Sequence, residues 1–155
     1  MVSVNNYRLL QAYGGLMDVA GTQVIADGNE VQFTSMDAVF GPTAYNTTPA
    51  ADFDDITVNV GGIYQICFEG DFHNGEEGDT LLTIRKNGTA ITNAKASLHF
   101  GSTAAEFSMF KHASINLLAT LSAGDILDVT LTCSSACTVT DKNVRFWVRR
   151  ICAAA

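Results

Sequence analysis

The feature that most restricts the fold of this chain is a period of two in its apolar residues. Over long stretches every second residue is apolar, as in Tyr64, Ile66 and Phe68. Successive side chains of a β-strand point to opposite faces, so this period gives a strand one apolar and one polar face. The three-to-four-residue spacing of an amphipathic helix is hard to find. The chain is therefore predicted to be almost entirely β-strand.

Turn-forming residues divide the alternating stretches into many short strands. Asn87-Gly88 is the strongest hairpin signal, because both residues tolerate a positive φ. An irregular segment containing both prolines is expected over residues 37–53. The predicted strands cover residues 7–14, 21–26, 30–35, 63–69, 79–86, 89–92, 107–117, 127–132 and 144–149.

Strands with one apolar face bury that face when two sheets pack together. The prediction is therefore an all-β fold, a two-sheet antiparallel sandwich or jelly roll. No repeat or linker divides the chain, so residues 1–152 are expected to form a single domain. The last three residues, 153–155, are interpreted as a remnant of cloning.

The charge and hydropathy of the chain argue against two classes of partner. Lys and Arg total 9 against 16 Asp and Glu, so the net charge of −7 does not attract nucleic acid or an anionic membrane. No run approaches the ~20 apolar residues that span a bilayer, so no membrane insertion is expected. Hydrophobic residues nevertheless make up 47% of the chain and charged residues only 16%. That balance suits stacked sheets or an oligomer that buries additional surface.

The 4 cysteines lack the C-x-x-C spacing of a structural zinc site. Cys133 and Cys137 bracket residues 134–136, a predicted hairpin tip, and a disulfide between them is one interpretation. The other is that both are free thiols, packed as small apolar residues. The sequence leaves the two alternatives open, and with them the redox compartment.

Catalytic motifs are absent from the sequence. It has no nucleophile elbow, no H-E-x-x-H pair, no P-loop and no dinucleotide-binding glycine pattern. His73, His99 and His112 are scattered and belong to no known motif. The chain is therefore predicted not to be an enzyme and to hold no cofactor, apart from calcium as one alternative.

The calcium alternative rests on the acidic, glycine-rich segment 71–79. Asp71, Glu76, Glu77 and Asp79 offer the hard oxygen ligands that Ca²⁺ prefers, but their spacing is not that of an EF-hand. The competing interpretation is a solvated acidic loop between two strands.

Several stretches of the chain resemble, in order and spacing, signature segments of bacterial C1q-like domains. Together they extend across almost the whole chain. They are Ala12-Tyr13-Gly14-Gly15-Leu16, Asp55-Ile56-Thr57-Val58 leading into Gly61-Gly62-Ile63-Tyr64, Leu82-Thr83-Ile84-Arg85-Lys86-Asn87-Gly88, and Leu121-Ser122-Ala123-Gly124-Asp125. The resemblance is to the C-terminal head domains of BclA-type collagen-like spore-surface (exosporium) glycoproteins of Bacillus and Clostridium, and to similar heads on phage and cell-surface fibres.

This resemblance implies a C1q/TNF-like jelly roll of about ten strands that forms a homotrimer around a three-fold axis. It implies that the sheet holding residues 62–64 and the last strand faces this axis. It also implies that a Gly-X-Y collagen stalk usually precedes the head in the chain. The chain departs from the family in having no Gly-X-Y repeat and in its cysteines at 67, 133 and 137. The candidate trimer-interface residues are Ile63, Gln65, Cys67, Arg145, Trp147 and Arg149.

Two functions are compatible with such a head. The first is a structural, surface-exposed trimer that nucleates trimerisation of a collagen-like stalk on a spore or cell surface. The second is a receptor- or carbohydrate-binding module at a fibre tip, with a host or matrix ligand held by loops around residues 71–79 and 101–105. A polar, aromatic-rimmed pocket on these loops would favour the second.

Overall fold

The computed structural model of the chain describes residues 12–18, 24–33, 35–36, 47–49, 54–103, 109–134 and 138–153. These residues form eleven strands, and none of them lies in a helix that could cross a membrane. The strands are β1 (Tyr13–Asp18), β2 (Val24–Ala26), β3 (Ser35–Met36), β4 (Thr47–Pro49), β5 (Asp55–Val58), β6 (Gly62–Asn74), β7 (Gly78–Lys86), β8 (Thr89–Phe100), β9 (Lys111–Leu121), β10 (Ile126–Cys133) and β11 (Thr138–Cys152).

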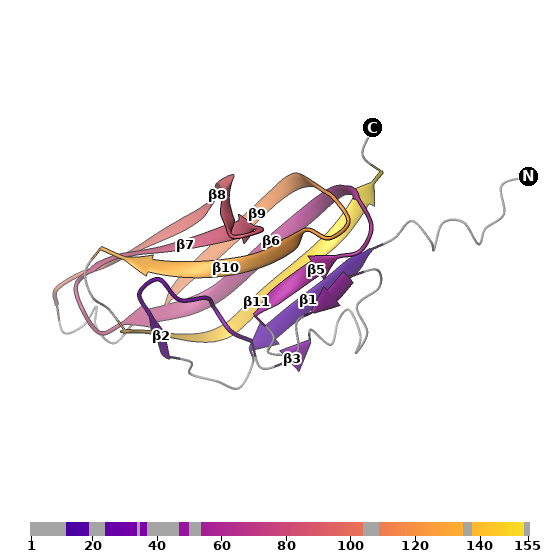
Figure 1. Ribbon diagram of the computed structural model, residues 1–155. Coiled ribbons are helices and arrows are strands. Elements are labelled where there is room, and N and C mark those ends of the chain that lie inside the picture. Colours follow the sequence, from indigo (N-terminus) through magenta and orange to yellow (C-terminus); the bar gives the residue numbers. More distant parts are fainter. Residues whose placement is uncertain are drawn as a thin grey trace, which may run out of the picture.

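The strands form two sheets that pack face to face (Figure 1). The six-stranded sheet has the order β3-β1-β11-β6-β9, with β2 added beside the first part of β11. The five-stranded sheet has the order β4-β5-β10-β7-β8. The first and last long strands, β1 and β11, are antiparallel neighbours. The predicted all-β, two-sheet antiparallel jelly roll is confirmed.

Several strands differ from their predicted limits, two of them for clear physical reasons. The strand expected over residues 63–69 extends to Asn74, because its alternation continues through Phe72. Residues 30–35 were expected to be one strand, but Glu30 forms only an isolated bridge with Thr130. The N–H of Val31 donates to the carbonyl of Val129 at 2.8 Å, so this segment lies beside the part of β10 that extends beyond the first residue of β5.

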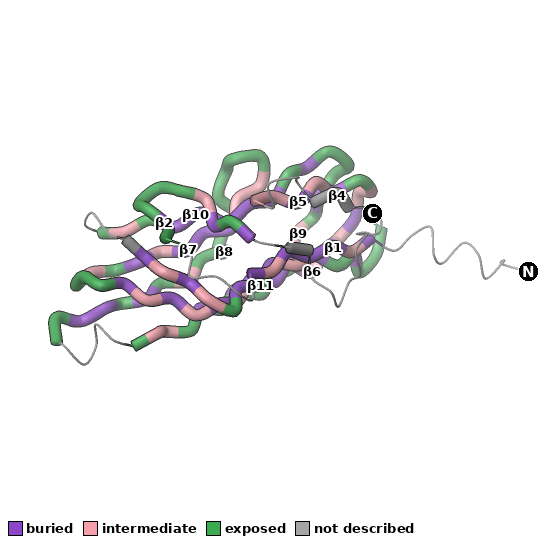
Figure 2. Tube along the Cα trace, turned by 90° about the horizontal axis from the view of Figure 1, so that it is seen from below, coloured by how far each residue is buried: buried purple, intermediate pink, exposed green. Residues whose placement is uncertain are grey.

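The core lies between the two sheets and is formed by the inward-facing residue of each alternating pair. Figure 2 shows this alternation of buried and exposed positions along the strands. Phe68 packs against Phe72 and Phe146, with ring centroids 6.0 and 6.4 Å away. Each large apolar side chain stabilises the fold by about 1.5–3 kcal/mol when fully buried. The largest fully buried residues are Tyr64, Phe68, Phe72, Phe100, Phe146, Leu16, Ile25, Ile56, Ile66, Leu82, Ile84 and Leu121.

Two inward-facing cations, Lys111 and Arg150, cover the core near opposite ends of β6. In the strand ladders Lys111 pairs with Phe72 and Arg150 pairs with Tyr64. The Lys111 ammonium donates to the carbonyl of His99 on the other sheet and lies 5.3 Å from the Phe100 ring centroid. Arg150 is only 8% exposed, and its Nε donates to the Gly61 carbonyl at 2.9 Å. Both side chains cover apolar residues with their stems while their charged heads reach polar atoms.

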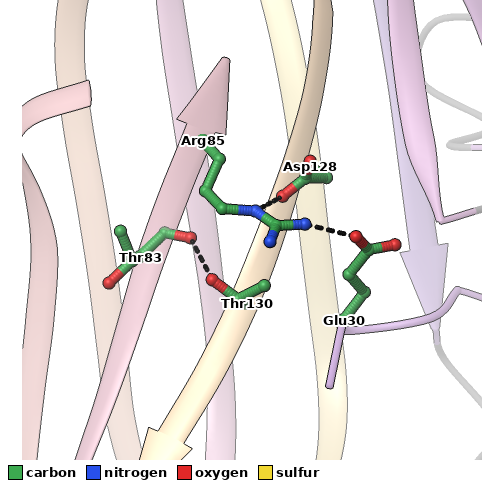
Figure 3. Close-up of polar contacts among 5 residues, drawn as sticks. All are labelled: Glu30, Thr83, Arg85, Asp128 and Thr130. Carbon is green, nitrogen blue, oxygen red and sulfur yellow. Dashed lines mark hydrogen bonds and ion pairs between the residues drawn. The ribbon is translucent and has the colours of Figure 1, made fainter. Parts of the chain in front are cut away.

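A partly buried ion cluster on the five-stranded sheet holds the 28–31 segment in place (Figure 3). Arg85 Nε donates to Asp128 Oδ1 at 2.5 Å, and its Nη2 donates to Glu30. The hydrogen bond to Asp128, with the nearby Glu30, raises the pKa of Arg85 despite partial burial. Thr130 contributes a further hydroxyl bond to the Thr83 carbonyl at 3.4 Å.

Gly62 provides a direct test of the packing around Arg150. A Cβ at Gly62 would lie 2.4 Å from Arg150 Nε and 2.5 Å from the Cys152 carbonyl oxygen. Gly62→Ala is expected to lower the free energy of unfolding by about 1–3 kcal/mol, because the backbone carbonyl cannot move aside. Gly75→Ala is the matched control, since a Cβ there meets nothing within 4 Å. Urea denaturation should separate the two variants, and equal stabilities would contradict this packing.

Candidate functional site

The pairing of β6 with β11 brings the six predicted interface residues to one surface. Trp147 pairs with Cys67 and Arg149 with Gln65, while Ile63 pairs with Cys152. The residues between them in each strand point into the core, so these side chains lie on the outside of the six-stranded sheet. We call this surface the outer face. Its residues include Tyr13, Met17, Ile63, Gln65, Cys67, Glu69, Asp71, His112, Ser114, Asn116, Leu118, Thr120, Lys142, Arg145, Trp147, Arg149 and Ile151.

The outer face is apolar in its basal half, the half nearest the start of β1 and the end of β11. Leu118 is 66% exposed and Ile151 is 53% exposed. Trp147 is half-buried, with the buried Cys67 beside it in the ladder. A Gln65–Asn116 hydrogen bond of 3.3 Å crosses the surface between β6 and β9. Large apolar side chains this exposed are typical of a surface that another molecule covers.

A β-bulge in β11 separates this basal half from a polar distal half. The register shifts by one residue between Lys142 and Arg145, and Asn143 takes a left-handed φ of 54°. The bulge lies opposite Gly70, where a Cβ would approach Val144 Cγ2 to 2.9 Å. The extra residue adds the Asn143 side chain to the outer face.

Asp71 is the centre of the distal half. Its Oδ1 lies 3.0 Å from His112 Nδ1, and its Oδ2 accepts from Asn143 Nδ2 at 3.2 Å. Partial burial raises the pKa of Asp71, but the hydrogen bonds from His112 and Asn143 and the charge of Lys142 outweigh it and leave the pKa lowered. Lys142 Nζ also lies 3.9 Å from the Phe110 ring centroid. The distal half is therefore a preformed polar cluster.

The Cys67 thiol is unreactive in this environment. Burial, with the nearby Glu69 carboxylate, raises the pKa of its thiol to about 11. The thiol therefore stays protonated at neutral pH, which disfavours it as a nucleophile or a metal ligand. Its contribution to the outer face is apolar area.

Three charged side chains on the outer face make no hydrogen bond, ion pair or cation–π contact with the described residues. They are Arg145, Arg149 and Glu69. Arg145 and Glu69 are register partners across β11 and β6, whereas Arg149 lies two residues beyond Trp147. Guanidinium and carboxylate groups without partners are available to bind groups on another molecule.

The opposite surface, outside the five-stranded sheet, has a different character. Thr83 and Thr130 at its centre are buried polar residues, and the ion cluster of Arg85 is satisfied internally. Ile126, 39% exposed, is its only large exposed apolar side chain within the described ranges. The outer face and the opposite surface therefore differ in their exposed apolar residues and in the pairing of their charges.

The chain is similar to known proteins in fold but not in sequence. No family model matches the chain, and no curated protein matches it in sequence. The Eiger TNF of S. frugiperda matches in fold with a TM-score of 0.71 and 11% identity, over 94% of each chain. The globular domain of zebrafish complement 1qA matches with a TM-score of 0.63 and 16% identity, over 92% of this chain and 99% of that one. Murine APRIL matches with a TM-score of 0.65 and 13% identity, over 91% and 99%.

The chain has a C1q/TNF-like fold. The predicted C1q/TNF-like jelly roll is thereby confirmed. The closer resemblance to bacterial BclA-type heads stays a prediction, because identities this low establish the fold alone. None of the three names describes an enzyme.

The four candidate calcium ligands lie apart in this C1q/TNF-like domain. Asp71 faces out from the six-stranded sheet, bonded to His112, whereas Asp79 lies on β7 with His99 Nδ1 at 2.8 Å. Glu76 and Glu77 are exposed in the turn between β6 and β7. Within the described ranges no three His, Cys, Asp or Glu side chains are placed to hold a metal ion. Calcium binding stays an untested prediction.

The cysteine prediction is tested only in part. Cys133 is disulfide-bonded, and Cys67 and Cys152 are free thiols. Cys137, the expected partner of Cys133, lies outside the described residues. The Cys133 N–H donates to Asp27 Oδ1 at 2.8 Å, which ties this end of β10 to the loop after β2.

Sequence analysis missed Leu118 and the Asp71–His112 pair. Leu118 follows Leu117 in an alternating strand, so the apolar doublet was a signal that one leucine faces outward. Asp71 and His112 are paired across β6 and β9, far apart in the sequence. Only the register of the two strands could identify that pair.

The lowered pKa of Asp71 predicts a specific pH dependence. A carboxylate with a lowered pKa stabilises the folded state above about pH 4, and this contribution is lost as the pH falls through the folded pKa. Asp71→Asn should therefore be slightly less stable than wild type at pH 7, by less than about 1 kcal/mol. It should also lose less stability between pH 5 and pH 2.

The matched control is Asp79→Asn, which removes the carboxylate of the other Asp–His pair. The Asp79 side chain is 63% exposed, against 32% for Asp71, so the control should follow the wild-type curve. Thermal melting followed by circular dichroism at several pH values gives the comparison. Parallel curves for wild type and Asp71→Asn would contradict the assignment.

Proposed function

We propose that this domain is the trimeric head of a surface-exposed, extracellular protein, with the outer face as its subunit interface and no catalytic role. The observation that carries the proposal is the exposed apolar basal half of the outer face, with Leu118 66% and Ile151 53% exposed. The opposite surface has no comparable patch among the described residues. Burial of this area between copies would stabilise an oligomer.

The fold supports a head at the end of a longer assembly. Tyr13, at the start of β1, pairs with Arg149 near the end of β11, and the Arg150 N–H donates to the Ala12 carbonyl at 2.7 Å. A segment joined before β1 would therefore enter at the basal end, leaving the β6–β7 turn at the far end. In this arrangement the head would set the register of a collagen-like stalk on a spore or cell surface, and present its distal end outward.

The first test is the solution mass of the purified domain, measured by light scattering. Wild type is expected at about three times the chain mass of 16.5 kDa. Leu118→Lys, on the outer face, should give monomers, because three ammonium groups would enter the apolar interface. Ile126→Lys, on the opposite surface, is the matched control and should stay trimeric. A wild-type monomer, or a trimer unaffected by Leu118→Lys, would refute the proposal.

The stalk function needs a separate experiment. A Gly-X-Y segment joined before residue 12 should melt at a higher temperature when the head trimerises than when Leu118→Lys prevents it. The physical reason is that a trimeric head holds three chain ends together, which raises their effective concentration. Circular dichroism of the triple helix measures the melting temperature. Equal melting temperatures would leave a trimer without a nucleating role.

A second function is favoured by the distal half of the outer face. His112 and Asn143 are exposed around Asp71, and Phe110 lies beside Lys142. Planar polar groups next to an aromatic ring are suited to binding a carbohydrate or a receptor loop at a fibre tip. Glycan-array binding that is lost in Asp71→Asn but kept in Leu118→Lys would favour this function.

A further inference from the structure

Most cations in the described part of the chain have a partner. Arg85, Lys86 and Arg150 bind carboxylates or a backbone carbonyl. Lys111 and Lys142 bind a carbonyl or lie over an aromatic ring. The exceptions within the described ranges are Lys95, Arg145 and Arg149, and two of these three are on the outer face.

Glu69 is the matching exception among the carboxylates of the outer face. Asp71, on the same strand, is hydrogen-bonded to His112 and Asn143, whereas Glu69 has no partner among the described residues. Glu69 stands directly across from Arg145 in the ladder, with Ser114 on its other side. Directly opposed residues have close Cβ atoms, yet these two side chains do not form an ion pair.

Covering the outer face would make these free charges costly. A charge that is removed from water without a partner strongly destabilises a complex. A trimer about a three-fold axis has heterologous contacts, in which one patch meets a different patch of the next copy. If each copy carries a positive and a negative residue at the same level along the three-fold axis, the positive residue of one copy can meet the negative residue of the next.

We propose that Arg145 of each copy forms an ion pair with Glu69 of the neighbouring copy. The proposal rests on the proposed trimer and names the contact that fixes its register. Three such pairs form a ring of alternating charge at the level of the Met17–Arg145–Glu69–Ser114 row, just beyond Trp147. The partner recognised by this surface is a second copy of the chain.

A charge-swap experiment tests this contact. Arg145→Glu and Glu69→Arg each place like charges together, so each should weaken the trimer by roughly a hundredfold or more. The double variant Arg145→Glu, Glu69→Arg restores opposite charges and should recover most of the wild-type trimer. Sedimentation over a dilution series measures the dissociation constant, and urea denaturation confirms that each variant folds.

Lys95→Glu is the matched control, because Lys95 is an exposed cation on the five-stranded sheet and has no partner among the described residues. It changes the net charge by the same amount as Arg145→Glu and should leave the trimer intact. The ion pair would be refuted if the single charge reversals do not weaken the trimer, or if the double variant weakens it by the combined effect of the two single variants. Either result would leave the proposed trimer itself unaffected. A wild-type monomer would instead refute the proposed function itself.

Discussion

The long antiparallel ladder between β6 and β11 is the contact on which the rest of this structure depends. Its inward residues, among them Tyr64, Phe68 and Phe146, supply much of the core. Its outward residues, including Trp147 and Cys67, make the centre of the outer face. Because side chains alternate along both strands, the register that fills the core also fixes which residues share the outer face. Fold and candidate site are therefore set by the same hydrogen bonds.

Two charged side chains, Lys111 and Arg150, cover the open ends of the core between the sheets. A sandwich of two sheets is open at its ends, where water can reach the core between the layers. Lys111 crosses from β9 to the His99 carbonyl, and Arg150 reaches the Gly61 carbonyl near the other end of β6. Their aliphatic stems add apolar cover and their heads satisfy backbone oxygens. In this fold an inward-facing cation in an alternating strand thus covers the end of the core.

The sequence was sufficient to predict the layers of this molecule but only part of its surface. Alternation alone identified the inward parity of Tyr64, Ile66 and Phe68, and the Asn87-Gly88 turn has the positive φ values expected of it. The segment after Glu30 was misassigned, because its hydrogen bonds go to β10, which is distant in sequence. Alternation also cannot distinguish an outward residue that meets water from one that meets another subunit, which is why Leu118 was overlooked.

The distal cluster was beyond prediction for a related reason. Asp71, His112 and Asn143 come from three strands, and Asn143 joins them only because the bulge turns its side chain outward. A bulge depends on the partner strand, and nothing in the local pattern of β11 specifies Gly70 opposite it. Residues brought together by cross-strand register require the structure.

The bulge at Asn143 also makes β11 two segments with different phases. Before it, odd-numbered residues such as Val139 and Asp141 are buried, and after it, even-numbered residues such as Val144 and Phe146 are buried. The distal segment is therefore uncoupled from the parity of the basal one. An insertion or deletion of one residue at the bulge would therefore exchange the inward and outward side chains of one segment of β11.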